Sequence, residues 1–234
     1  MPGLIVRQRH KPQTWAGLWL FGLFTALLPM LTIHLTWIIS GAQGYLHWCN
    51  PYWFSCHSIS ATGRYGLAYF LFKGGMIPAI VLLAFYWWIN HLWLRSLGAA
   101  GGRALFVLGI FASLALLVYS LSLGHAGDTF QLLRRTGVLA YLGFTFIAQV
   151  ILGAALSGFV PAQGKRLLQL SGLTLMLAMA SLLLDVLPVV DYKRMDNAVE
   201  WFLVLLLNLH AIAVAWLWKV NGLGLQLIMK KQVH

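Results

Sequence analysis

Long apolar stretches, separated by short polar connections, dominate the sequence. Six of them are long enough to cross a membrane as helices, at about 15–40, 66–93, 104–124, 136–159, 167–189 and 198–219. A helix rises 1.5 Å per residue, so about 20 residues cross a hydrocarbon core of about 30 Å. The pattern predicts an all-α polytopic membrane protein in which six transmembrane helices form one bundle and one domain, 1–234.

Charged residues are divided unequally between the two ends of these spans. One end carries all the acidic residues: Asp128, Asp185, Asp191, Asp196 and Glu200. The other end carries ten of the sixteen basic residues: Arg7, Arg9, Lys11, Arg95, Arg103, Lys165, Arg166, Lys219, Lys230 and Lys231. Lys and Arg accumulate on the cytoplasmic side of membrane proteins. We therefore expect both termini in the cytoplasm and the acidic end on the outer face.

Composition narrows the possible classes of protein. Apolar residues make up 60% of the chain and charged residues 9%, against about a quarter charged in soluble domains. The net charge of +11 lies in short clusters between the spans, as expected for basic residues that face anionic lipid, so no nucleic-acid partner is predicted. The sequence has no Asn-x-Ser/Thr sequon, and its terminal lysines lie one position off a dilysine signal. Both features favour a bacterial cytoplasmic membrane. If the source is eukaryotic, we expect an endomembrane instead.

The outer connection between the first two spans, 41–65, is the longest and contains both cysteines, Cys49 and Cys56. In an oxidising compartment the simplest interpretation is a disulfide, which would contribute about 2–3 kcal/mol by restricting the unfolded chain. Free thiols are an alternative. A third possibility is a tetrahedral metal site, because His47 and His57 flank the cysteines and supply two nitrogen ligands.

Three segments resemble the Frag/DRAM/Sfk family of six-span membrane proteins, which includes the remodelling factor for glycosylphosphatidylinositol anchors and the autophagy modulators. They are Cys49-Asn50-Pro51 followed by 58–63 (Ser-Ile-Ser-Ala-Thr-Gly), then 125–128 (His-Ala-Gly-Asp), and 197–201 (Asn-Ala-Val-Glu-Trp). The resemblance implies six spans and a role in lipid handling. DRAM-like members often have an acidic residue after the Thr-Gly turn, where this chain has Arg64.

Several ionisable residues lie in or beside the outer half of the spans. A charge at that depth is costly unless it is paired or hydrated, so each is a candidate site residue. We predict a polar outer-leaflet site that binds lipid headgroups, with arginines suited to phosphate. Its expected residues are Arg64, Lys73, His125, Asp128, Arg134, Arg135, Asp185 and Glu200. Alternatively, Lys73 extends to the interface and Glu200 stabilises a helix N-terminus. We further expect Lys73 to pair with Glu200 or Asp185.

The leading hypothesis is a non-enzymatic protein that recognises or organises membrane lipids, alone or with a membrane-protein partner. One alternative is an intramembrane acyltransferase or hydrolase, with Ser58 or Ser60 as nucleophile and His125 as base. Asp128 or Asp185 would then orient the histidine. The sequence lacks the usual catalytic motifs, so no catalytic residue is assigned. A second alternative is a structural small subunit of a larger membrane complex.

No cofactor is expected other than a bound phospholipid. Two histidines within the spans, His34 and His210, leave haem ligation as a weak alternative, because haem iron accepts imidazole ligands from facing helices. Hydrogen bonding between helices explains these histidines more simply.

Overall fold

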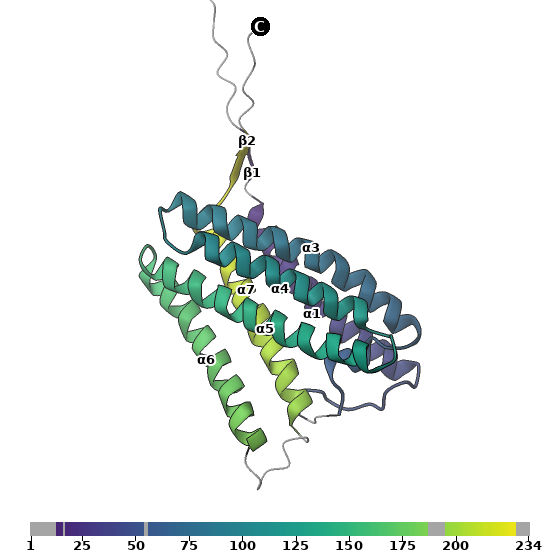
Figure 1. Ribbon diagram of the computed structural model, residues 1–234. Helices are drawn as coiled ribbons and strands as arrows, with labels where there is room; N and C mark the ends of the chain where they lie inside the picture. The colour runs from purple at the N-terminus through teal and green to yellow at the C-terminus, as the bar shows by residue number, and fades with distance from the viewer. Residues whose placement is uncertain (1–12, 16, 54–55, 187–194, 228–234) are drawn as a thin grey trace, which may run out of the picture.

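The computed structural model describes residues 13–15, 17–53, 56–186 and 195–227, and these residues form a helical bundle (Figure 1). The prediction of six helices long and apolar enough to span a membrane is confirmed. They are α1 (Leu18–Ala42), α3 (Gly66–Ser96), α4 (Gly102–Ser122), α5 (Asp128–Ser157), α6 (Pro161–Val186) and α7 (Asp196–Val220). A single-turn helix, α2 (Ile59–Thr62), lies in the connection between α1 and α3. Asp191, Lys193, Arg194 and the basic residues within 1–12 and 228–234 lie outside the described residues.

The two ends of the described chain lie at the same end of the bundle. Strand β1 (Gln13–Trp15) precedes α1, strand β2 (Leu225–Leu227) follows α7, and the two pair in antiparallel fashion. This strand pair was not predicted. An even number of spans requires both ends on one side, and the strand pair fulfils that requirement; which side is cytoplasmic stays a prediction.

Two helices begin earlier than the hydrophobic pattern predicts. The fourth span begins at Asp128 rather than 136, directly after Gly127, whose φ of 102° only glycine adopts readily. The fifth begins at Pro161 rather than 167, since proline is favoured in the first turn of a helix. With 30 residues, α5 is about 45 Å long and exceeds the hydrocarbon core by several turns. Its first turns therefore raise polar side chains to headgroup level.

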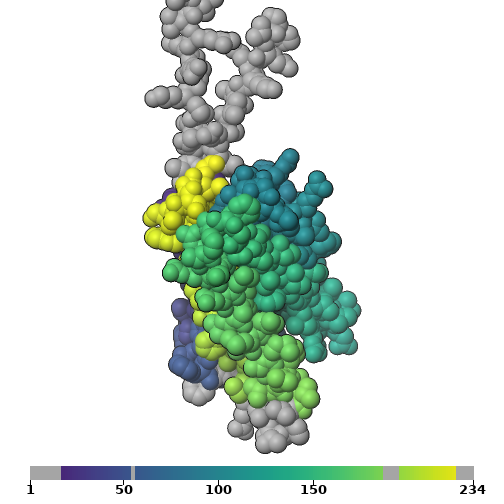
Figure 2. Space-filling view, turned by 90° about the vertical axis from the view of Figure 1, so that its left-hand side faces the viewer, coloured from purple at the N-terminus to yellow at the C-terminus, as the bar shows by residue number. Residues whose placement is uncertain are grey.

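Neighbouring helices pack in a defined order. Helix α4 lies against α3 and α5, α1 lies against α3 and α7, and α6 lies against α5 and α7. From the short turn after α5, α6 diverges from α5 and runs toward the same end of the bundle as the start of α7 (Figure 1). Figure 2 shows α5 and α6 covering one face. The side chains of Met176, Leu182 and Leu183 on α6 are more than 60% exposed, as expected for a helix that faces lipid.

The interior contains two apolar clusters, one toward each end of the bundle. The cluster nearer the chain ends surrounds Trp87 and Trp218. The other surrounds Phe72, Tyr119 and Trp201 at the opposite end, which is called the outer end below after the side predicted for it. Close approach of α4 to α3 depends on Gly109, because a Cβ there would collide with the Trp87 ring. The outer cluster forms the base on which the candidate site rests.

Candidate functional site

The outer loop is closed by the predicted disulfide between Cys49 and Cys56. Next to it, His57 is buried and its ring packs on the ring of His47 with 4.3 Å between centroids. Burial lowers the pKa of His57, although its hydrogen bond to the His47 carbonyl oxygen acts in the opposite direction. The disulfide and this ring pair give the loop a compact, folded end.

Helix α2 is held between α1 and α7. The Glu200 carboxylate on α7 accepts a hydrogen bond from the backbone N–H of Ile59 at 3.4 Å. This carboxylate satisfies a free N–H group at the helix N-terminus and complements its partial positive charge. On the other side, Ser40 of α1 donates to the Thr62 carbonyl oxygen at 2.6 Å, and the Thr36 and Thr62 hydroxyls lie 3.0 Å apart. The position of α2 is therefore fixed by both neighbouring helices.

A cavity of about 380 Å³, lined by several charged residues as well as apolar surface, opens beside α2 at this outer end. Residues from α2, the loop after it, α4, α5 and α7 line it: Ser60, Arg64, Tyr119, Gln131, Arg134, Arg135, Val138 and Glu200. Four predicted headgroup residues thus converge here, namely Arg64, Arg134, Arg135 and Glu200. We call this cavity the outer pocket.

The arginines of the outer pocket are held in different ways. Arg64 donates from Nη2 to the Ser60 hydroxyl at 3.0 Å. Arg134 donates from Nη1 to the carbonyl oxygens of Ser122 (3.0 Å) and His125 (2.9 Å), which stabilises the C-terminal end of α4. Arg135 is exposed at the pocket mouth. Arg64 and Arg135 are therefore the more available of the three for a ligand.

The floor of the outer pocket contains a buried hydroxyl without a partner. Tyr119 is 3% exposed, and its Oη accepts and donates no hydrogen bond within the described residues. The Nε of Arg64 is likewise buried without a partner. Buried polar groups are nearly always hydrogen-bonded, so these two atoms at the edge of the outer pocket lack the partners that such groups usually have.

The electrostatics of the outer pocket favour an anion. Three guanidinium groups, those of Arg64, Arg134 and Arg135, face one carboxylate, that of Glu200. Guanidinium groups bind phosphate oxygens through paired, charge-assisted hydrogen bonds. A phosphate group is therefore the ligand that best matches this lining.

An apolar groove of about 140 Å³ lies farther along the same helices. It is lined from α5, α6 and α7 by Leu142, Gly143, Phe146, Thr174, Leu175, Ala178, Leu203 and Leu207. On α5 the pocket residue Val138 is followed four positions later by the groove residue Leu142, and on α7 Glu200 is followed by Leu203. Residues three or four apart share one helix face. The outer pocket and the groove therefore follow one another along two helices.

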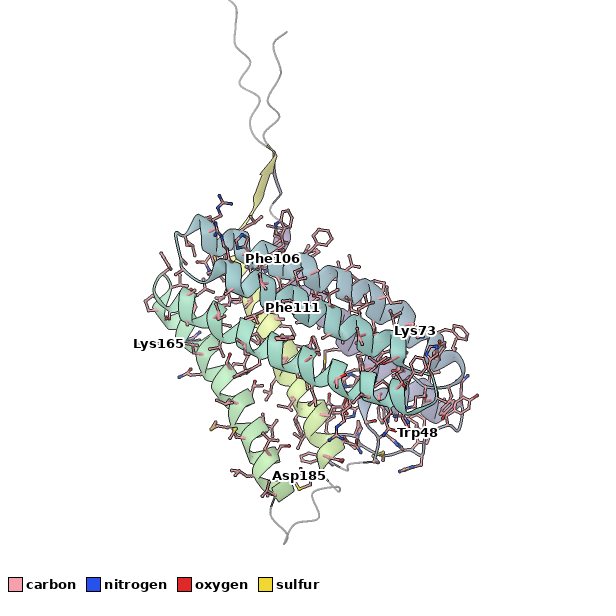
Figure 3. The ribbon with its side chains drawn as sticks, viewed as in Figure 1. Trp48, Lys73, Phe106, Phe111, Lys165 and Asp185 are labelled. Carbon is pink, nitrogen blue, oxygen red and sulfur yellow. A yellow bond between two sulfur atoms is a disulfide. The ribbon has the colours of Figure 1, made fainter. Side chains whose placement is uncertain are left out.

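Three of the other predicted headgroup residues lie apart from the pocket lining. The His125 ring stacks on Phe130 at 4.7 Å, and only its carbonyl oxygen reaches Arg134. Asp128 is exposed in the first turn of α5. Asp185 is exposed near the end of α6, where Figure 3 shows it well separated from Lys73.

Lys73 does not pair with an acid in the described part of the chain, so the expected pairing with Glu200 or Asp185 was wrong. Its ammonium group donates to the Tyr69 hydroxyl at 2.7 Å and to the Leu121 carbonyl oxygen at 3.5 Å. It also lies 4.4 Å from the centre of the Tyr69 ring. Two residues after Lys73, α1 approaches α3 at Gly75, where a Cβ would collide with the Thr32 side chain.

The residues of the enzymatic alternative do not form a nucleophile and base pair in this structure. The Ser58 and Ser60 hydroxyls lie 3.2 Å apart, and Ser60 also accepts from Arg64. Within the described residues neither hydroxyl is hydrogen-bonded to an imidazole or a carboxylate. A guanidinium donor beside Ser60 stabilises an anion near the hydroxyl but does not remove its proton.

The two histidines considered for haem lie at different depths. His34 hydrogen-bonds through Nδ1 to the Met30 carbonyl oxygen (2.7 Å) and through Nε2 to the Tyr52 hydroxyl (3.0 Å). Its ring also contacts Trp201 at the outer end of α7. His210 follows Trp201 by nine residues, about 13 Å along the helix, and is 1% exposed. The two rings therefore do not face one another across a common site.

Sequence reasoning did not identify Tyr119, Gln131 and Val138 as pocket residues, nor the apolar groove. A weak signal for Tyr119 was available, since it belongs to a Tyr-Ser-Leu-Ser stretch at the outer end of the third predicted span. Gln131 and Val138 carry no such signal, because their role depends on which side of α5 faces α4 and α7.

No protein-family model, no curated protein and no solved structure matches this chain. The resemblance to the Frag/DRAM/Sfk family therefore stays a prediction from the three segments that carry it.

Proposed function

We propose that this protein is a non-enzymatic lipid-recognition protein that binds an anionic phospholipid. The phosphate group would occupy the outer pocket and one acyl chain would occupy the apolar groove. The observation that carries the proposal is the shared register of the two cavities: Val138 and Leu142 continue one face of α5, and Glu200 and Leu203 continue one face of α7.

The depth of the outer pocket agrees with the position of lipid phosphates. Helix α4 has 21 residues and is about 32 Å long, close to the thickness of the hydrocarbon core. Tyr119 lies three residues before its last residue, Ser122, so the pocket is level with the outer end of the core. The polar part of a lipid in the groove would then meet the arginines without leaving the bilayer.

Lipid selectivity tests the headgroup half of the proposal. Full-length protein in detergent is titrated with dioleoyl phosphatidylglycerol or dioleoyl phosphatidylcholine, and bound lipid is measured by native mass spectrometry. The anionic lipid should bind more tightly. Arg64→Gln and Arg135→Gln should each weaken its binding about fivefold, from about 1 kcal/mol per basic residue near an anionic headgroup.

Arg103→Gln is the matched control, because it removes the same charge from a different cavity beside the α3–α4 turn, at the opposite end of the bundle. It should leave phosphatidylglycerol affinity unchanged. Equal affinity for both lipids, or equal losses in Arg103→Gln and Arg135→Gln, would refute a specific headgroup site.

Filling the groove tests the acyl-chain half. Gly143 lines the groove and a Cβ there meets no atom within 4 Å, so Gly143→Leu should fold and occupy the groove. It should weaken binding of the dioleoyl lipid. Inorganic phosphate should still compete with the lipid for the outer pocket as well as it does in the wild type. Gly74→Leu on α3, which also meets open space, is the control and should bind lipid normally. Unchanged lipid binding in Gly143→Leu would leave the outer pocket as a phosphate site only.

The same mass spectra distinguish recognition from catalysis. A non-enzymatic protein leaves the lipid masses unchanged on prolonged incubation. Release of a headgroup or acyl chain by the wild type, lost in both Ser60→Ala and His125→Ala, would instead establish the hydrolase alternative.

A further inference from the structure

Two cysteines and two histidines of the outer loop lie close together, apart from the outer pocket. One ligand atom from each of the four side chains lies within 4.8 Å of the others: His47, Cys49, Cys56 and His57. Zinc binds sulfur at about 2.3 Å and imidazole nitrogen at about 2.0–2.1 Å in tetrahedral sites. These bond lengths place neighbouring ligand atoms about 3.3–3.8 Å apart. The most distant ligand atoms would therefore close by about 1–1.5 Å, and the two sulfurs, which are bonded in the disulfide, would move apart to about 3.8 Å once it is reduced.

The hydrogen bonding of His57 already has the form found around zinc ligands. Its Nε2 lies 3.1 Å from the His47 carbonyl oxygen, so it is Nε2 that carries the proton and Nδ1 that keeps a free electron pair. Metal-binding histidines usually donate their second ring nitrogen to a carbonyl or carboxylate group in this way. The carbonyl oxygen of His57 is in turn held by the Trp201 indole N–H at 3.0 Å. The backbone that presents this imidazole is therefore fixed to α7.

We infer that the outer loop contains a redox-controlled zinc site formed by His47, Cys49, Cys56 and His57. In the oxidised protein the two sulfurs form the disulfide and do not bind zinc. In the reduced protein two thiolates and two neutral imidazoles bind one Zn²⁺ in a tetrahedral S₂N₂ set, which zinc prefers. The proposal is independent of lipid binding in the outer pocket.

The redox step is a two-electron reduction of one S–S bond. A phosphine reductant cleaves the bond and takes oxygen from water to become a phosphine oxide, which leaves two cysteine thiols. Binding of Zn²⁺ then releases the two thiol protons, so metal affinity rises with pH. Both states connect residues 49 and 56, either through the disulfide or through the metal. The loop therefore keeps its contacts with α7 in either state.

Zinc stoichiometry in the full-length protein tests this inference. The protein is purified in detergent, treated with or without a phosphine reductant, equilibrated with Zn²⁺ and freed of unbound metal by gel filtration. We expect one zinc per chain after reduction and none without it. Cobalt(II) should give thiolate charge-transfer absorption and the spectrum of a tetrahedral ion in the reduced protein only.

Variants identify the ligands. Reduced Cys49→Ser/Cys56→Ser should retain no zinc, and His47→Gln should bind it at least about tenfold more weakly, since even the loss of an outer-shell partner costs 10–100-fold. His47 is exposed, so its substitution leaves folding intact. His125→Gln, another outer-face histidine, should retain full affinity. The inference fails if the reduced wild type binds no zinc, if the serine variant binds it equally, or if the oxidised wild type binds it equally.

Discussion

The indole N–H of Trp201 donates a hydrogen bond of 3.0 Å to the carbonyl oxygen of His57, and both residues are buried. This bond joins the first turns of α7 to the outer loop, 144 residues earlier in the chain. Together with the Glu200 contact to Ile59 it places the loop, α2 and Arg64 beside α7. The outer pocket therefore depends on a connection between two distant segments.

Trp201→Phe should destabilise the protein by about 1–3 kcal/mol, because it leaves the buried His57 carbonyl oxygen without its donor. Thermal unfolding in detergent measures the change. Trp87→Phe is the matched control: Trp87 is equally buried, but its indole N–H has no partner in the described chain. Only the Trp201 variant should also expose the loop disulfide to faster reduction. Equal reduction rates in the two variants would contradict this role of Trp201.

The neighbouring glycines of α3 should respond differently to alanine. A Cβ at Gly75 would collide with the Thr32 side chain of α1, whereas a Cβ at Gly74 meets no atom within 4 Å. Gly75→Ala should cost about 1–3 kcal/mol through overpacking. Gly74→Ala should be neutral or stabilising by up to about 1 kcal/mol, since alanine favours the helix. Similar melting temperatures for both variants would show that α1 and α3 do not pack closely at Gly75.

Lys73→Met should be tolerated, because Lys73 donates to Tyr69 and a backbone carbonyl oxygen rather than to an acid. We expect a change in unfolding free energy below about 1 kcal/mol. In the double variant with Glu200→Gln the two effects should add within about 0.5 kcal/mol. A larger coupling, in which Glu200→Gln recovers the stability lost in Lys73→Met, would instead support the ion pair expected from the sequence.

Glu200→Gln should strengthen the binding of phosphatidylglycerol. The amide oxygen keeps an acceptor for the Ile59 N–H, while the carboxylate that lines the outer pocket together with its arginines is removed. We expect about a fivefold gain, from about 1 kcal/mol for one unit of charge near the headgroup. Native mass spectrometry measures it. Weaker binding in this variant, with phosphatidylethanolamine as the preferred lipid of the wild type, would mean that Glu200 contacts an ammonium group.

The sequence by itself determined the number of spans, the long connection between the first two of them and the end of the bundle at which the candidate site lies. These features depend on the length of apolar runs and on the positions of charges, both of which are local. The sequence also favoured the disulfide over free thiols or a metal site, because Cys49 and Cys56 are the only cysteines and are seven residues apart, and the structure contains it. Arg134 and Arg135 could also be placed at that end, since a charge in the hydrocarbon core is costly unless it is paired or hydrated.

Tertiary structure decided which face of each helix turns inward, and so it decided the site. In a bilayer both the lipid-facing and the helix-facing surfaces are apolar, so the hydrophobic pattern does not distinguish them. Trp87 is fully buried and its neighbour Trp88 is 42% exposed, although both are tryptophans. The rotation of each helix likewise places Tyr119 in the outer pocket, Leu142 in the groove and Lys73 beside Tyr69. Their partners are fixed by the rotation and packing of whole helices.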